Sequence, residues 1–285
     1  MHACLTLLVR KMKTKQPAMP EPTDPEPLEP EPGLPPDFAL LGLCYDRTQT
    51  LWKGAALAPA MLREAFPKLE TFVHGIDLTE SGLDDLGDIE TTSEKELHKQ
   101  TAARLGSTRK FPIILGGEHS VSLAAVKALK PDTVMILDAH PDCEAGEAHN
   151  AVTRRIAELV GPENVILFGP RSISAAEAAY LKSSGIRLIK GMKDLKVPKG
   201  RTYLSVDLDV LDPSEISSVG NPEPMGMSFA EVSQAINAVA PVLIGADFVE
   251  FTPIEKMNNL TRIHALLAGK LIYSTMAAVV KAKKK

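Results

Sequence analysis

Short runs of aliphatic residues alternate with longer amphipathic segments along most of this sequence, and this alternation limits the fold more than any other feature. Runs such as VMIL and YLSV are almost continuously apolar. Strands of that kind are covered on both faces, as in a parallel sheet between two layers of helices. The candidate strands lie at 38–43, 72–76, 112–115, 133–137, 165–168, 186–189, 202–206 and 242–246. The candidate helices, with apolar residues at helical spacing, lie at 93–105, 120–129, 151–160, 175–183 and 229–239.

The alternation begins near residue 37. The segment before it, 17–36, is rich in proline and glutamate. Proline lacks a backbone donor and glutamates repel one another, so such a segment stays extended and poorly packed. We therefore predict a disordered N-terminal tail over residues 1–36. Residues 37–285, which show no internal repeat, are predicted to form one three-layer α/β/α domain.

Composition excludes several classes of protein. The net charge of −4 and the aromatic content of 5% argue against a nucleic-acid partner. We find no run of about 18 apolar residues, so we expect no membrane partner. The three cysteines form no CxxC pair, which disfavours a disulfide framework or a thiolate zinc site and favours a cytoplasmic location.

Acidic and histidine residues gather where four of the candidate strands end. The segments are GGEHS at 116–120, DAHPD at 138–142, DLDVLDP at 207–213 and DFVEFTP at 247–253. Ligands bind at the carboxyl ends of strands in parallel sheets. Charged side chains in such apolar surroundings are costly to desolvate, and a cation is the simplest compensation.

The spacing within these segments sharpens the prediction, because residues i, i+2 and i+4 of an extended chain point to one side. The converging residues, with the histidine of GGEHS, are His119, Asp138, His140, Asp142, Asp207 and Asp209. Two imidazoles and four carboxylates exceed what one dication needs, so two adjacent ions that share bridging carboxylates suit the set. The absence of thiolates favours Mn²⁺ over structural zinc. One such motif alone could equally be a turn that caps a helix, but three clusters at three strand ends are harder to explain that way.

In this order and at these separations, the four segments resemble signature segments of the ureohydrolases, the arginase and agmatinase family, and most of all its agmatinase-like, archaeal-type members. Weaker similarity at 54–63 and in GNPEPMG at 220–226 extends the resemblance from about residue 37 to the C-terminus. The resemblance implies an arginase-like fold with an eight-stranded, mainly parallel sheet, and two Mn²⁺ ions per chain. The implied ligands of the first ion are His119, Asp138, Asp142 and Asp207. Those of the second are His140, Asp138, Asp207 and Asp209.

The same resemblance implies a reaction, the hydrolysis of a guanidino compound to urea and an amine. A water shared by two dications loses a proton near neutral pH and can attack the guanidinium carbon. The leaving amine needs a proton, and His149 matches the family histidine that carries it. The alternative for His149 is a solvent-exposed loop histidine. Glu250 matches the glutamate that pairs with the guanidinium group.

The substrate is predicted from the short loop that follows Asp142. Glu144 and Glu147 on this loop would attract the terminal ammonium of agmatine or of an aminopropyl-extended agmatine, and would repel the α-carboxylate of arginine. Arginase or guanidinobutyrase activity is the alternative within the family. Alternatives of another class are a non-catalytic metal-binding family member and a zinc deacetylase of related fold. The resemblance also implies a homo-oligomer, a trimer or hexamer.

Overall fold

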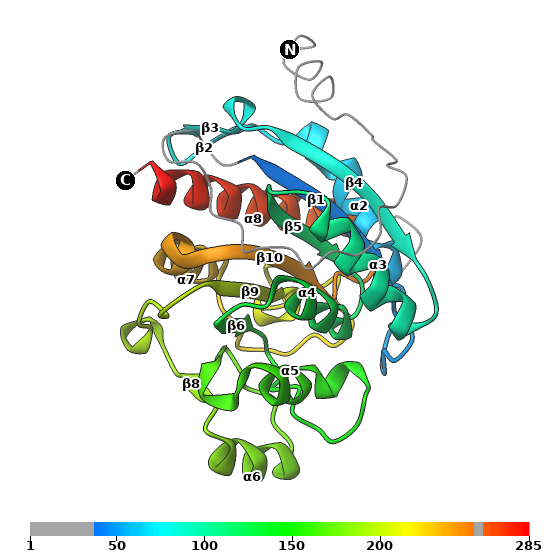
Figure 1. The fold of residues 1–285 in the computed structure, drawn as a ribbon, viewed down its shortest axis with the longest axis vertical. Coiled ribbons are helices and arrows are strands. Elements are labelled where there is room, and N and C mark those ends of the chain that lie inside the picture. The colour runs from blue at the N-terminus through cyan, green and yellow to red at the C-terminus, as the bar shows by residue number, and fades with distance from the viewer. Residues whose placement is uncertain (1–36, 254–258, 285) are drawn as a thin grey trace.

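The centre of the computed structural model, which describes residues 37–253 and 259–284, is an eight-stranded parallel sheet (Figure 1). Its strand order is β4-β1-β5-β10-β9-β6-β7-β8, and each neighbouring pair is parallel. The strands are β1 Phe38–Cys44, β4 Leu83–Glu90, β5 Phe111–Gly116, β6 Thr133–Leu137, β7 Val165–Phe168, β8 Arg187–Ile189, β9 Thr202–Asp207 and β10 Leu243–Val249. The predicted tail, 1–36, lies outside the described residues.

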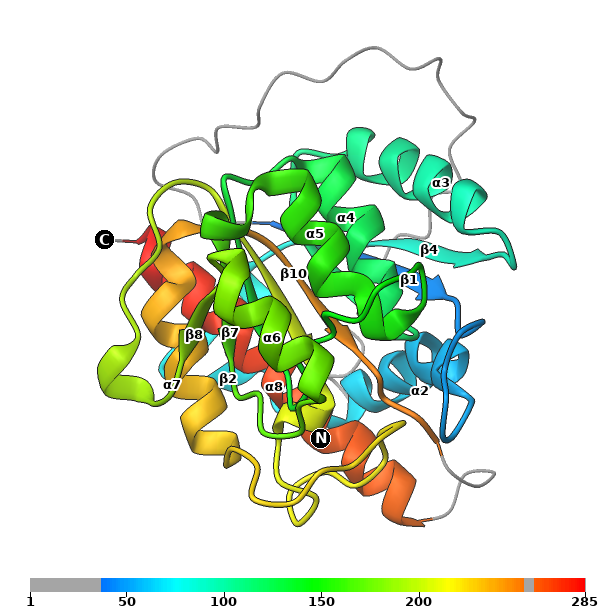
Figure 2. The same ribbon diagram turned by 90° about the horizontal axis from the view of Figure 1, so that it is seen from below.

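Helices cover both faces of this sheet, which confirms the three-layer prediction. In Figure 2, α3, α4 and α5 lie on one side of the strands, and α2, α7 and α8 lie on the other. The helices are α2 Ala58–Ala65, α3 Glu94–Gly106, α4 Ser122–Leu129, α5 Val152–Val160, α6 Ala175–Ser184, α7 Phe229–Val239 and α8 Asn259–Lys283. Five of them match predicted helices within a few residues, and α2 and α8 were not predicted.

Successive residues of the central strands enter two different cores. In β5, Ile113 and Leu115 pack with α2, α7 and α8, while Ile114 packs with α3, α4 and α5. All three side chains are fully buried. This arrangement explains why the strands read as continuous apolar runs, because neither face of the sheet meets solvent.

One predicted strand is wrong. The segment 72–76 forms part of a separate antiparallel pair, β2 Phe72–Val73 and β3 Ile76–Asp77, and does not enter the main sheet. The eighth strand is β4, whose sequence LDDLGDIE is rich in acidic residues. Because β4 is an edge strand that pairs only with β1, it tolerates polar residues that a central strand would exclude.

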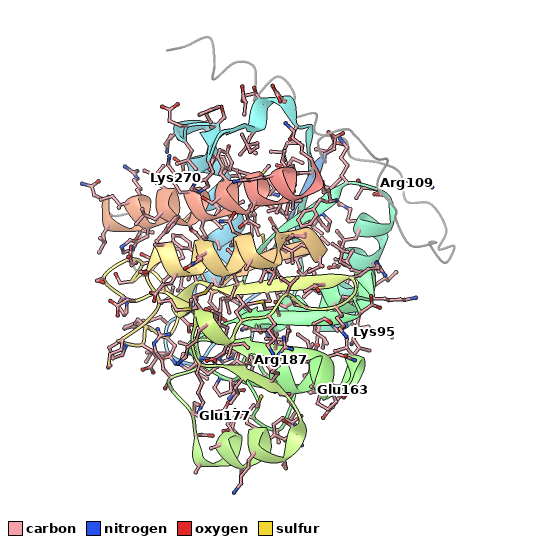
Figure 3. All side chains as sticks on the ribbon, turned by 90° about the vertical axis from the view of Figure 1, so that its left-hand side faces the viewer. Lys95, Arg109, Glu163, Glu177, Arg187 and Lys270 are labelled. Carbon is pink, nitrogen blue, oxygen red and sulfur yellow. The ribbon has the colours of Figure 1, made fainter. Side chains whose placement is uncertain are left out.

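Helix α8 is long and apolar enough to cross a membrane by length and composition, with an 18-residue window of mean hydropathy 1.5. Within the protein, however, 78% of that window is buried. It packs against α2 and α7, and Lys270, labelled in Figure 3, is an exposed residue on it. The apolar composition of α8 therefore fits a core helix.

Candidate active site

The predicted ligands lie at the carboxyl ends of three strands, β5, β6 and β9, at one edge of the sheet. Strands β5, β10, β9 and β6 are consecutive neighbours. His119 lies in the 3₁₀ turn that follows β5, and Asp138 directly follows β6. Asp207 ends β9, and Asp209 lies in the turn after it. These three strands thus bring together side chains that are up to 90 positions apart in the sequence.

The first group of ligand atoms surrounds the His119 ring. Its Nδ1 lies 3.0 Å from Asp138 Oδ2, 3.1 Å from Asp142 Oδ2 and 3.3 Å from Asp207 Oδ2. Asp142 reaches this position with a left-handed backbone, φ 48°. This is the set of four residues predicted for the first ion.

The second group surrounds the His140 ring. Its Nδ1 lies 2.9 Å from Asp209 Oδ2 and 3.6 Å from Asp138 Oδ1. Asp138 therefore faces both histidines, one with each carboxylate oxygen. Two groups of three residues could each hold a cation, since the candidate ligand atoms of each group lie within 4.8 Å of one another. One group is His119, Asp138 and Asp207, and the other is His140, Asp138 and Asp209, so Asp138 belongs to both.

The environment of this cluster fits a bound cation. His119 and Asp138 are fully buried, and neither His119 Nδ1 nor Asp138 Oδ2 has a hydrogen-bond partner among the described residues, although the two atoms are 3.0 Å apart. Unpaired buried polar atoms are costly. Both atoms are of the kind that a divalent ion takes as ligands, so a cation at this place would satisfy both.

A chain of hydrogen bonds fixes which nitrogen of His119 faces the carboxylates. Ser205 donates to Asp247 Oδ1 at 2.6 Å, and Tyr203 donates to Asp247 Oδ2 at 2.7 Å. With its proton used in this way, Ser205 Oγ accepts from His119 Nε2 at 3.1 Å. The proton of a neutral His119 ring then sits on Nε2, and the lone pair of Nδ1 points to the carboxylates. Such outer hydrogen bonds orient metal-binding histidines.

The carboxyl groups of this cluster cannot all ionise easily without a cation. Burial raises the pKa of Asp142 to about 7, and the charge of Asp138 adds to this effect. Burial also raises the pKa of Asp207 well above its ordinary range, helped by Asp209 and Asp138. For His119, burial lowers the pKa, but the surrounding carboxylates outweigh burial and raise it well above the ordinary value. The cluster thus attracts positive charge strongly.

Beside the cluster is a cavity of about 200 Å³ whose wall includes Asp207, Asp209, Glu250 and His149. Glu250 follows β10 and also has a left-handed backbone, φ 63°. Its Oε1 accepts from the backbone N–H of His119 at 2.7 Å. Burial raises the pKa of Glu250 to about 8, although this hydrogen bond opposes the effect. Non-glycine residues with such backbones often lie at functional sites.

His149 lies at the start of a 3₁₀ turn and is partly buried. Its backbone N–H donates to Thr48 Oγ1 at 2.8 Å, and its Nδ1 lies 3.5 Å from the same oxygen. Burial lowers the pKa of His149, so the neutral ring dominates at neutral pH. The structure thus places His149 on the cavity wall, unlike the alternative of a solvent-exposed loop histidine.

A buried carboxylate, Glu118, ties the loop that carries Thr48 to the predicted ligand His119. Glu118 is fully buried and accepts from Thr48 N and Thr48 Oγ1, both at 2.6 Å, and from Gln49 N at 3.0 Å. Ser120 Oγ donates to it as well, at 2.6 Å. Neither Glu118 nor Gln49 was predicted as a site residue. The only signal for Glu118 was its position next to the histidine of GGEHS.

The two glutamates predicted to bind substrate differ in position. Glu144 lines the cavity, and its Oε1 accepts from Ser174 Oγ at 2.7 Å. Glu147 is exposed and does not line the cavity, so the structure does not bring it to the site. Glu177, which was not predicted, lines the same cavity as Glu144. Cys143, which directly follows the predicted ligand Asp142, does not line the cavity, and its thiol donates to Pro141 O at 3.1 Å.

Comparison with known proteins identifies similar chains over most of this length. The family model described as "Arginase family" matches residues 36–278. The N(1)-aminopropylagmatine ureohydrolase of Thermococcus kodakarensis is 33% identical over 273 residues, which cover 86% of this chain and 91% of that protein. An agmatinase of Bacillus anthracis is 33% identical over 255 residues, which cover 80% of this chain and 88% of that protein. Among solved structures, the agmatine ureohydrolase of Thermoplasma volcanium superposes with a TM-score of 0.74 at 31% identity, and covers 86% of this chain and 90% of its own.

Proposed function

This chain belongs to the arginase family, and we propose from that premise that it hydrolyses agmatine or an aminopropyl-extended agmatine to urea and an amine. One observation carries the proposal: two overlapping groups of candidate ligands share the buried Asp138. Other members of these groups line the cavity that Glu250 and His149 also line, namely His140, Asp207 and Asp209. Binding of a cationic guanidino substrate and hydrolysis are then possible at one place.

The cofactor in this proposal is a pair of Mn²⁺ ions. His119, Asp138, Asp142 and Asp207 would hold one ion, and His140, Asp138, Asp207 and Asp209 the other. Nitrogen and oxygen donors without thiolates suit manganese, and the unpaired atoms His119 Nδ1 and Asp138 Oδ2 support a bound cation. When bound, two such ions make water acidic enough to act as a nucleophile near neutral pH.

The protein side chains then perform two tasks. The Glu250 carboxylate accepts two parallel N–H bonds from the guanidinium group and so fixes the plane of that group for attack. His149, neutral at neutral pH because burial lowers its pKa, accepts a proton during the reaction and delivers it to the nitrogen of the leaving amine. The backbone hydrogen bond to Thr48 holds His149 at the cavity wall.

The far end of the substrate is proposed to lie beside Glu144. An ammonium group there would meet a carboxylate, while the α-carboxylate of arginine would meet like charges from Glu144 and Glu177. Like charges near a partly desolvated site cost about 1–3 kcal/mol. The aminopropylagmatine named for the Thermococcus relative would satisfy the same requirement. Glu147 has no support from the geometry.

The test is a urea-release assay with chelator-treated protein to which Mn²⁺ is restored. The panel contains agmatine, aminopropylagmatine, guanidinobutyrate and arginine. We expect kcat/KM for one of the first two to exceed that for arginine at least about tenfold, a difference of only about 1.4 kcal/mol. Two ions bound without urea release from any compound would instead indicate a non-catalytic family member.

Three further parts of the proposal concern the whole protein. We propose a cytoplasmic enzyme, a tail at residues 1–36 that precedes the catalytic domain, and assembly as a trimer or hexamer. Exposed apolar residues such as Leu57, Leu260 and Ile263 are consistent with assembly. Light scattering of the full chain and of a chain that begins at residue 37 tests the last two together.

A further inference from the structure

The Gln49 side chain is buried, with 5% of its surface exposed, and forms part of the cavity wall next to Glu250. Its Nε2 donates to Glu250 Oε2 at 2.7 Å and to Thr252 Oγ1 at 3.1 Å. Its Oε1 accepts from the backbone N–H groups of Gly54 at 3.2 Å and Ala55 at 3.3 Å. The amide of Gln49 therefore uses both of its N–H donors and both acceptor positions of its oxygen.

These contacts determine which end of the amide faces Glu250. The Gly54 and Ala55 contacts come from backbone N–H groups, which can only donate, so the atom that faces them must be the oxygen. The NH₂ group of Gln49 is then necessarily directed at the Glu250 carboxylate. Gly220 packs closely against both side chains. A Cβ atom at this position would lie 2.9 Å from Gln49 Nε2 and 2.9 Å from Glu250 Oε2, so a larger residue would disturb their contact.

As a result, the Glu250 carboxylate is held from two sides by neutral donors. His119 N binds Oε1 and Gln49 Nε2 binds Oε2, each at 2.7 Å. A carboxylate oxygen has two lone pairs, so one on each oxygen remains for the two parallel N–H groups of a guanidinium. Neutral donors fix the orientation of the carboxylate and leave its negative charge uncompensated for the substrate.

We propose that Gln49 is a positioning residue that fixes the plane of the Glu250 carboxylate for the guanidinium group of the substrate. The inference rests on the proposed function, in which Glu250 binds that group. It adds a residue from the loop after β1, a part of the chain that provides none of the predicted metal ligands or catalytic groups.

A purely structural role for Gln49 would be to anchor the loop at Gly54 and Ala55, and two substitutions separate the roles. Gln49→Glu keeps an oxygen to accept from Gly54 and Ala55, but places an anionic oxygen where Nε2 faced Glu250. Gln49→Met has similar size and loses both sets of hydrogen bonds. If the residue only anchors the loop, Gln49→Met is the more damaging change and Gln49→Glu resembles wild type. If it positions Glu250, Gln49→Glu is damaging, because two carboxylates would be about 3 Å apart.

The matched control is Gln100→Glu on α3. Gln100 Nε2 donates to Glu96 Oε1 at 2.9 Å, so this change also sets a carboxylate against a glutamate, but neither residue lines the cavity. Kinetics are measured at about pH 9, above the pKa of about 8 to which burial raises Glu250. Inhibition by 1,4-diaminobutane, which lacks a guanidinium, reports on the rest of the cavity, and bound manganese per chain reports on the ligands.

We expect Gln49→Glu to raise KM for the guanidino substrate about tenfold or more and to lower kcat by a smaller factor. The inhibition constant of 1,4-diaminobutane and the manganese content should change less than twofold, and Gln100→Glu should match wild type. Wild-type KM in Gln49→Glu, or equal weakening of substrate and 1,4-diaminobutane, would overturn the inference while leaving the proposed function intact. Absence of urea release by the wild-type enzyme would instead remove the proposed function itself.

Discussion

Gly117 is the position where the smallest possible change should disturb the site most. It lies between β5 and the His119 turn, and a Cβ atom there would come 2.0 Å from Tyr45 O and 2.9 Å from both Tyr45 C and Tyr45 N. All three atoms are backbone. In the same segment, Glu118 N donates to Tyr45 O at 2.8 Å, and Gly117 O accepts from Glu250 N at 2.9 Å. We predict that Gly117→Ala displaces these segments.

The size of the effect follows from the overlap. Contacts below 3.0 Å do not occur for real Cβ atoms, so Tyr45 O at 2.0 Å must move by about 1 Å. Overpacking of this kind typically costs about 1–3 kcal/mol, and a displacement of about 1 Å near the reacting groups can cost about 10²-fold in rate. We expect the melting temperature to fall by about 3–10 °C and kcat/KM for agmatine to fall about 100-fold.

Urea release and thermal unfolding by circular dichroism measure the two effects. The control is Gly191→Ala, because a Cβ at Gly191 meets nothing within 4 Å and the backbone there is extended, φ −171°. It should leave both quantities unchanged. Wild-type stability together with wild-type kcat/KM in Gly117→Ala would refute the idea that this close approach of two backbones holds the site together.

Other predictions test the site residue by residue. Asp138→Asn should abolish urea release and lower bound manganese from about two ions per chain to one or fewer, measured by atomic emission, because a shared carboxylate neutralises two charges. His149→Phe should keep the metal content but lower kcat about 10²–10⁴-fold. Burial lowers the pKa of His149 in the folded protein, so as the pH falls below the ordinary value of about 6.5 the unfolded chain binds a proton more readily than the folded one. The midpoint concentration of urea-induced unfolding should therefore fall more between about pH 7 and 5 for wild type than for His149→Phe. Glu144→Gln should reduce the preference for agmatine over arginine chiefly by raising KM for agmatine, and an unchanged preference would exclude Glu144 from substrate binding.

The sheet was largely predictable because most of its strands are buried on both faces. A short, continuous apolar run such as VMIL in β6 is typical of a strand in that environment. The edge strand β4 escaped prediction because LDDLGDIE pairs with one neighbour only and retains acidic residues. Helix α8 escaped for the opposite reason: most of its surface is buried, so no polar face marks its helical period.

The residues of the candidate site also differ in whether they could be predicted from the sequence. The predicted ligands occur at the ends of strands, where the regular geometry of the sheet places them, so spacing such as that of Asp138 and His140 was informative. Gln49 lies in the loop after β1 and reaches Glu250 only through the path of that loop. No periodicity in the sequence describes such a path, and a buried glutamine has no compositional signature.

The strand order has a consequence for how the protein forms during synthesis. Strand β10, made last, lies between β5 and β9. Before residues 243–249 leave the ribosome, β4-β1-β5 with His119 and β9-β6-β7-β8 with the aspartates can exist only as separate halves. Their union depends on contacts between distant parts of the chain, which form slowly. A nascent chain that stalls before residue 243 would therefore hold the imidazoles of His119 and His140 in different halves, and the two groups of candidate ligands could meet only after the last strand is inserted.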